Sequence, residues 1–104
     1  MQNVNSGDFN QEVIQSKIPV VIDAYAVWCA PCRSISPIFE ELGKEFDGRI
    51  KFVKMDIDAN QDFASDHKIM SIPAFLVFKD GKEVYRKIGV FNKDSFKKDL
   101  DNLI

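Results

Sequence analysis

Runs of apolar residues along the chain predict the strands of a sheet. Residues 20–26 are almost entirely apolar and partly β-branched, which is typical of a strand covered on both faces. Further strands are expected at 50–55 and 74–78. The segment 79–82, Lys-Asp-Gly-Lys, favours a tight hairpin turn, because Asp-Gly accepts left-handed backbone angles. We therefore expect a strand at 83–88 that returns antiparallel to the strand at 74–78.

Apolar residues at three- and four-residue spacing predict helices between these strands. The longest such pattern runs from Pro31 to Phe46 and gives the helix one apolar face. Pro31 suits the first turn of this helix, whereas Pro37 lies inside it and should bend it. Three shorter helices are also expected. Their opening residues and inward-facing positions are Asp8 with Phe9, Val13 and Ile14; residues 58–60 with Phe63 and Ala64; and Asn92 with Phe96, Leu100 and Leu103.

The order of these elements predicts an α/β fold. The strand at 20–26, the long helix and the strand at 50–55 form a right-handed parallel crossover, and a short strand is expected near Val4. The predicted architecture is a three-layer α/β/α sandwich with a central mixed five-stranded sheet and four helices. A chain of 104 residues is long enough for one domain, which we expect to span residues 1–104.

Composition and charge exclude several classes of function. Lys and Arg number 14 and Asp and Glu number 16, so the formal net charge is −2, and the two signs are interspersed. Nucleic acids and anionic membranes bind basic faces, which this sequence lacks. No apolar run approaches the roughly 20 residues that span a bilayer. The polar N-terminus does not resemble a signal peptide, so we expect a cytoplasmic protein. Without heptads or a large unexplained apolar stretch, we expect a monomer.

The only two cysteines stand where the first long strand should lead into the long helix, in the run Trp28-Cys29-Ala30-Pro31-Cys32. Cys29 should lie at the helix N-terminus, where unpaired amides and the helix dipole stabilise a thiolate. We therefore expect Cys29 to be the more exposed, nucleophilic thiol with a lowered pKa. Cys32, one turn inside the helix, should be the more buried, resolving thiol. In the cytoplasm, where structural disulfides are rare, such a pair favours a reversible dithiol–disulfide switch.

Two other interpretations of the cysteine pair stay open at this point. The cysteines could be ordinary residues that are close by chance. They could also bind zinc, but a structural zinc ion takes four ligands. Besides the cysteines this chain offers only one histidine, His67, so a carboxylate would have to complete the set. We predict no metal site, and we expect His67 to be a polar residue at a helix end without a catalytic role.

Asp23 interrupts the apolar strand at 20–26, six residues before Cys29. Burial removes the hydration of a carboxylate and raises its pKa toward neutral. A buried Asp23 could therefore take the proton from Cys32 as that thiol attacks. Alternatively, Asp23 faces solvent at a strand edge. Lys54, on the adjoining strand, could reach toward Asp23 and tune it, or it could be a solvated lysine.

These features together resemble the thioredoxin family over essentially the whole chain. The matching residues are the centre Trp28-Cys29-Ala30-Pro31-Cys32, then Asp23, Lys54, Pro37, Ile72-Pro73, Lys79-Asp80-Gly81 and Gly89. A Cys-x-x-Cys pair beside a βαβ pattern is itself a known signature of thioredoxin-like redox proteins. The chain departs from the commonest family pattern at Ala30, where glycine is usual, and at Tyr25, where tryptophan is frequent.

The resemblance implies a thioredoxin fold and a specific substrate site. It implies that Pro73 is cis and packs against the disulfide, and that the backbone of Ile72 pairs with the substrate chain. It implies a flat apolar docking surface made of Trp28, Ala30, Pro31, Ile72, Pro73, Gly89 and Val90. No cofactor is expected to be bound. Electrons would come from NADPH through a flavoprotein, thioredoxin reductase, and pass to disulfide-containing target proteins.

Three functions follow from this comparison. The leading hypothesis is a protein-disulfide reductase that works by dithiol–disulfide exchange through Cys29 and Cys32. The second is an oxidant or isomerase, a class that commonly carries histidine between its cysteines; Ala30 and Pro31 lack that charge. The third is a binding module without catalysis. Both cysteines together with Asp23 argue against this third hypothesis.

Overall fold

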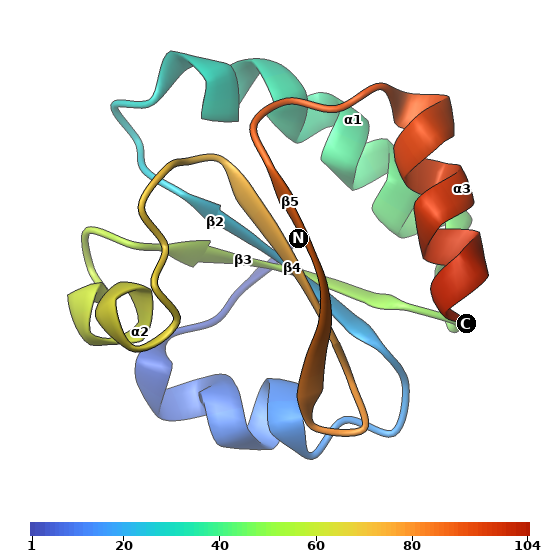
Figure 1. The fold of residues 1–104 in the computed structure, drawn as a ribbon, viewed down its shortest axis with the longest axis horizontal. Coiled ribbons are helices and arrows are strands. Elements are labelled where there is room, and N and C mark those ends of the chain that lie inside the picture. The colour runs from blue at the N-terminus through green and yellow to red at the C-terminus, as the bar shows by residue number, and fades with distance from the viewer.

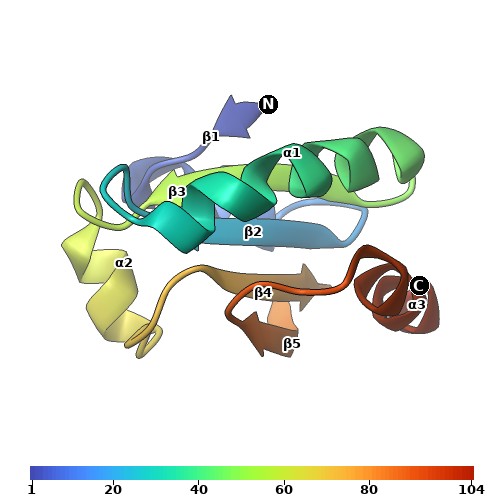
Figure 2. The same ribbon diagram turned by 90° about the horizontal axis from the view of Figure 1, so that it is seen from above.

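The centre of the structure is one mixed sheet, seen in a computed structural model that describes residues 1–104 (Figure 1). Its strands are β1 Gln2–Asn3, β2 Val20–Tyr25, β3 Lys51–Asp56, β4 Ala74–Lys79 and β5 Lys82–Ile88. Their spatial order is β1-β3-β2-β4-β5, which Figure 2 shows from edge to edge. β1 and β2 run parallel to β3, whereas β4 runs antiparallel to β2 and β5. The predicted mixed five-stranded sheet is confirmed.

Helices cover both faces of this sheet. They are α1 Ala30–Glu45, α2 Gln61–Asp66 and α3 Lys93–Leu103, preceded by a short helical segment in residues 6–14. α1 and α3 pack on one face, over a core of 12 buried residues that includes Val21 of β2 (Figure 1). α2 and the N-terminal segment pack on the other face, over 11 buried residues that include Ile22. Because adjacent β2 residues point to opposite faces, the strand needs apolar residues throughout, as its sequence predicted.

The N-terminal helical segment differs from its prediction. Instead of one helix capped by Asp8, a 3₁₀ turn spans Ser6–Asp8 and a π-helical turn spans Asn10–Ile14. The cap is Asn5, in an extended conformation, and its backbone N–H donates to Asp8 Oδ2 at 3.0 Å. Asp8 is therefore not the cap; it is the last residue of the first turn, and its side chain accepts from the cap residue. The apolar spacing was still informative, because Val13 is buried against the sheet.

The topology brings three separate segments to one end of the sheet. α1 follows the carboxyl end of β2 and continues through Pro37 to Glu45. β4 is antiparallel to β2, with Ala74 opposite Ala24, so the residues before β4 lie beside those that follow β2. The backbone N–H of Gly89 donates to the carbonyl of Pro73 at 2.8 Å, which adds the end of β5 to the group.

Candidate active site

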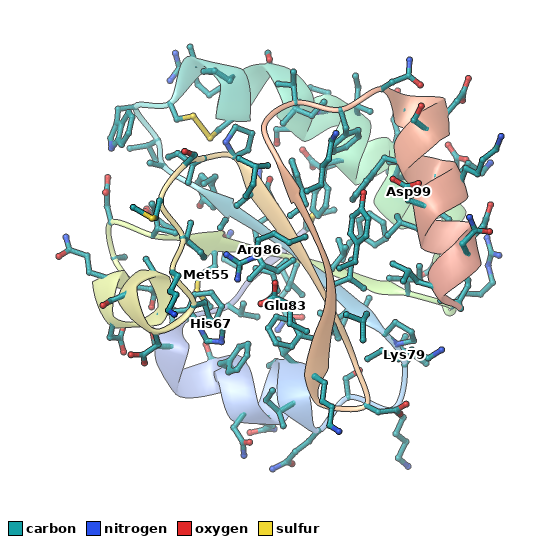
Figure 3. The ribbon with its side chains drawn as sticks, viewed as in Figure 1. Met55, His67, Lys79, Glu83, Arg86 and Asp99 are labelled. Atoms are coloured by element: carbon teal, nitrogen blue, oxygen red, sulfur yellow. A yellow bond between two sulfur atoms is a disulfide. The ribbon has the colours of Figure 1, made fainter.

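Cys29 and Cys32 form a disulfide at the N-terminus of α1, the sulfur–sulfur bond drawn in yellow in Figure 3. Their Cα atoms are 5.3 Å apart. Cys29 is the N-cap residue, and its Sγ accepts a hydrogen bond from the backbone N–H of Cys32 at 3.2 Å. Pro31 occupies the first turn, where its missing N–H leaves no bond unmade. After reduction, a thiolate on Cys29 would face the unpaired amides and the positive end of the helix dipole.

The expected difference in exposure between the two cysteines is wrong for the disulfide form. Cys29 is 4% exposed and Cys32 3% exposed, so both are buried. Other segments contribute to this burial: Tyr25, Ile57 and Ile72 pack against the cluster that Ala26 forms with the two cysteines. Cys29 Sγ lies 4.0 Å from the carbonyl oxygen of Ile72. The local sequence around a helix terminus does not indicate which distant residues will bury it.

Asp23 is completely buried on the face of the sheet that α1 covers, which excludes the solvent-facing alternative. Neither carboxylate oxygen has a hydrogen-bond partner. This burial raises the pKa of Asp23 from 3.8 to about 7, and the charge of Lys54 opposes the rise without cancelling it. A carboxyl group with such a pKa can both accept and release a proton at neutral pH.

Lys54 lies directly opposite Asp23 in the register of β3 and β2, yet the two form no ion pair. The Lys54 ammonium instead donates to Ser36 Oγ at 2.7 Å and lies 4.9 Å from the ring centroid of Tyr25. Lys54 therefore influences Asp23 through space. A cavity of about 350 Å³ opens here, and both Lys54 and Cys32 line it. Sequence reasoning missed Ser36; its position four residues after Cys32, on the same helix face, was the available signal.

The proposed docking residues lie around the disulfide, but they differ in exposure. Trp28 and Val90 are 66% and 54% exposed, and Ala30 and Pro31 are also exposed, whereas Ile72 and Gly89 are half-buried and Pro73 is buried. The Ile72–Pro73 bond is cis. Sequence reasoning missed Met70, which is 92% exposed two residues before Ile72. An apolar residue in a polar loop was the signal for it.

Asp58 and Arg86, which lie outside this surface, form hydrogen bonds to Trp28 and to the segment before Ile72. The indole N–H of Trp28 donates to Asp58 Oδ2 at 2.7 Å. On the other side, Arg86 donates to the backbone carbonyls of His67 at 2.8 Å and Lys68 at 3.3 Å. Glu83 orients the Arg86 guanidinium by a two-pronged ion pair, and Figure 3 shows Glu83, Arg86 and His67 side by side. The segment that leads to Ile72 is thus anchored to β5.

His67 does not join the cysteines. Its ring stacks on Phe63 with centroids 4.0 Å apart, and its Nδ1 lies 3.1 Å from the Phe63 carbonyl oxygen. The zinc alternative gains no support, because no group of three or more His, Cys, Asp or Glu side chains is arranged to hold a metal ion. None of the helices has the length and apolar character needed to cross a membrane.

Comparisons with known proteins agree with this geometry. The family model described as "Thioredoxin" matches residues 1–102. A protein named thioredoxin from Rickettsia felis is 42% identical over 93 residues, which cover 89% of each chain. A thioredoxin from Rickettsia bellii is 39% identical over 102 residues, covering 98% of this chain and 97% of the relative. A protein named thioredoxin 1 from Synechococcus elongatus is 39% identical over 98 residues, covering 94% of this chain and 92% of the relative.

Proposed function

We propose roles for the individual residues of this chain, which belongs to the thioredoxin family and is therefore a thiol-disulfide oxidoreductase and protein-disulfide reductase. The observation that carries the proposal is the placement of the Cys29–Cys32 pair at the N-cap of α1. The strand that precedes this helix, β2, carries the buried Asp23, whose carboxylate has no hydrogen-bond partner. This arrangement supplies a nucleophile, a resolving thiol and a proton acceptor within one site.

In the first step, the Cys29 thiolate attacks one sulfur of a target disulfide. A mixed disulfide forms between Cys29 and the target, and the other target sulfur leaves as a thiolate. The helix N-terminus supports this step because it stabilises negative charge on Cys29 before attack. The exposed apolar side chains of Trp28, Met70 and Val90 support docking of the target, with the carbonyl of Ile72 beside the attacked bond.

In the second step, Cys32 loses its proton and attacks the Sγ of Cys29. The Cys29–Cys32 disulfide forms, and the second target sulfur leaves reduced; the two electrons of the dithiol have passed to the target. Asp23 accepts the Cys32 proton, a role that its burial and its pKa of about 7 support. Cys32 and Lys54 line one cavity of about 350 Å³ beside this site.

The electron source and the cellular setting complete the proposal. We place NADPH and a flavoprotein thioredoxin reductase upstream of the Cys29–Cys32 disulfide, and disulfide-containing proteins downstream. The site proposed here is made by one chain, which fits a monomer. The reaction also suits the cytoplasm, where thiol–disulfide exchange keeps cysteines reduced.

Two single substitutions test the division of roles between the cysteines. In Cys32→Ser, Cys29 can attack but the mixed disulfide cannot be resolved, so covalent complexes with a disulfide substrate such as insulin should accumulate. Cys29→Ser serves as the matched control and should trap nothing. Trapping by Cys29→Ser, and not by Cys32→Ser, would reverse the assignment. Wild-type protein should accelerate insulin reduction by dithiothreitol; no acceleration would leave a binding role instead.

A further inference from the structure

The Lys54 ammonium is held by a helix residue that the reaction described above does not use. It donates to Ser36 Oγ at 2.7 Å, while the same hydroxyl donates to Glu40 Oε2 at 3.3 Å. The Tyr25 ring, 4.9 Å away at its centroid, adds a cation–π contact. Asp23, directly across the strand pair, receives no hydrogen bond at all.

We propose that Ser36 is a positioning residue for the proton chemistry of Asp23: its hydroxyl anchors the Lys54 ammonium beside Tyr25 and keeps that cation out of ion-pair contact with the buried carboxyl. The inference rests on the proposed role of Asp23 as proton acceptor. A carboxylate that gained a direct lysine partner would stay ionised at neutral pH and could no longer release a proton there.

The position of Ser36 on α1 explains why it can act as an anchor. It is half-buried at the wall of the cavity that Cys32 and Lys54 also line. Ser34, two residues earlier on the same helix, is exposed and donates to the Pro31 carbonyl at 3.1 Å. Of these two serines, only Ser36 bonds Lys54. The Glu40 carboxylate reinforces the anchor, because it accepts a hydrogen bond from the Ser36 hydroxyl and so leaves a lone pair of Oγ free to accept from the ammonium.

Among the charged groups around Asp23, Lys54 is the cation whose charge acts on the carboxyl group. On α1, Arg33 donates to the Val27 carbonyl at 2.8 Å and Glu40 is bound to Ser36. On β3, Asp56 accepts from the backbone N–H of Asp58.

The remaining strands add no competing cation next to the carboxyl. On β4, Asp23 faces the apolar Phe75, and Lys87 of β5 lies one strand further. The Tyr25 hydroxyl on β2 donates to Asn3 of β1. Release of Lys54 from Ser36 is therefore the change that would bring a positive charge toward Asp23.

The test is a carboxyl-carbon NMR titration of Asp23 in the disulfide form, where the cysteines do not titrate. Ser36→Ala should lower the titration midpoint of Asp23 by about one pH unit, the effect of an opposite charge that moves into close range. Ser36→Thr, which keeps the hydroxyl, should restore the wild-type midpoint. Ser34→Ala is the matched control and should leave it unchanged. In a Lys54→Gln background, Ser36→Ala should have no effect, because the cation is gone.

The outcomes separate this inference from the proposed function. If Ser36→Ala leaves the Asp23 midpoint unchanged, raises it, or lowers it equally in the Lys54→Gln background, the positioning role of Ser36 is wrong. If the midpoint falls as expected but the pH dependence of insulin reduction does not follow it, Ser36 positions Lys54 as proposed. In that case it is the proton-transfer role of Asp23 that fails.

Discussion

Replacement of Asp23 by asparagine should stabilise the protein at neutral and alkaline pH. The carboxyl group is completely buried without a hydrogen-bond partner, and its pKa rises from 3.8 to about 7. That rise corresponds to a penalty of about 4 kcal/mol for the ionised form in the folded state. Because the folded protein holds the proton more tightly than the unfolded chain, wild-type stability should fall as pH rises from about 4 to about 7, and then level off.

Denaturant unfolding of both proteins in the disulfide form measures this effect. The free energy of unfolding of Asp23→Asn, relative to the wild type, should increase by about 3–4 kcal/mol between pH 4 and pH 8. Groups that titrate equally in both proteins cancel in this difference. Asp101→Asn, which removes an exposed carboxyl group on α3, is the matched control for the loss of one carboxyl group. A constant difference for Asp23→Asn would refute the argument that this carboxyl is buried uncompensated.

Three further substitutions probe the supports of the site and its core. Asp58→Ala removes the acceptor of the Trp28 indole and should raise the KM for a protein disulfide about 3–10-fold, the loss of one hydrogen bond, with kcat unchanged; an unchanged KM would argue against a docking role for Trp28. Arg86→Met should lower the free energy of unfolding by about 1–2 kcal/mol and speed amide exchange in residues 67–72; exchange confined to β5 would contradict this. Phe39→Ala should cost about 3–5 kcal/mol, because the side chain is fully buried between the rings of Phe52 and Phe75; a loss below about 1 kcal/mol would show that the core closes around the gap.

The sequence predicted best where the signal was periodic and local. The apolar run at 20–26 and the three- and four-residue spacing after Pro31 identified β2 and α1, and the Asp-Gly turn identified the β4–β5 hairpin. The N-terminal segment was less regular. There a hydrogen bond from Asn5 to Asp8 and two non-α turns replaced the expected helix. The spacing of apolar residues does not distinguish these turns from an α-helix.

The site was predictable as a set of residues but not as an arrangement. Cys29 was expected to be exposed because it caps a helix, yet it is buried, and Ile72, 43 residues away, is one of the residues that pack against its cluster. The sequence allowed Asp23 to be buried or to face solvent, and only the packing of α1 on the sheet shows that it is buried. From the sequence, Lys54 could reach toward Asp23 or be a solvated lysine, whereas in the structure its ammonium donates to Ser36 Oγ on α1. Such contacts depend on how elements distant in sequence pack together, which no local pattern encodes.

The central claim is that Cys29, at the N-cap of α1, is the thiol that ionises and attacks. Its most direct test is the rate of alkylation of each cysteine in the reduced protein as a function of pH, followed by mass spectrometry of the labelled residue. We expect Cys29 to be labelled first, with a midpoint clearly below the value of about 8.5 for an ordinary thiol. Labelling of Cys32 first, or a Cys29 midpoint at or above that value, would contradict the account.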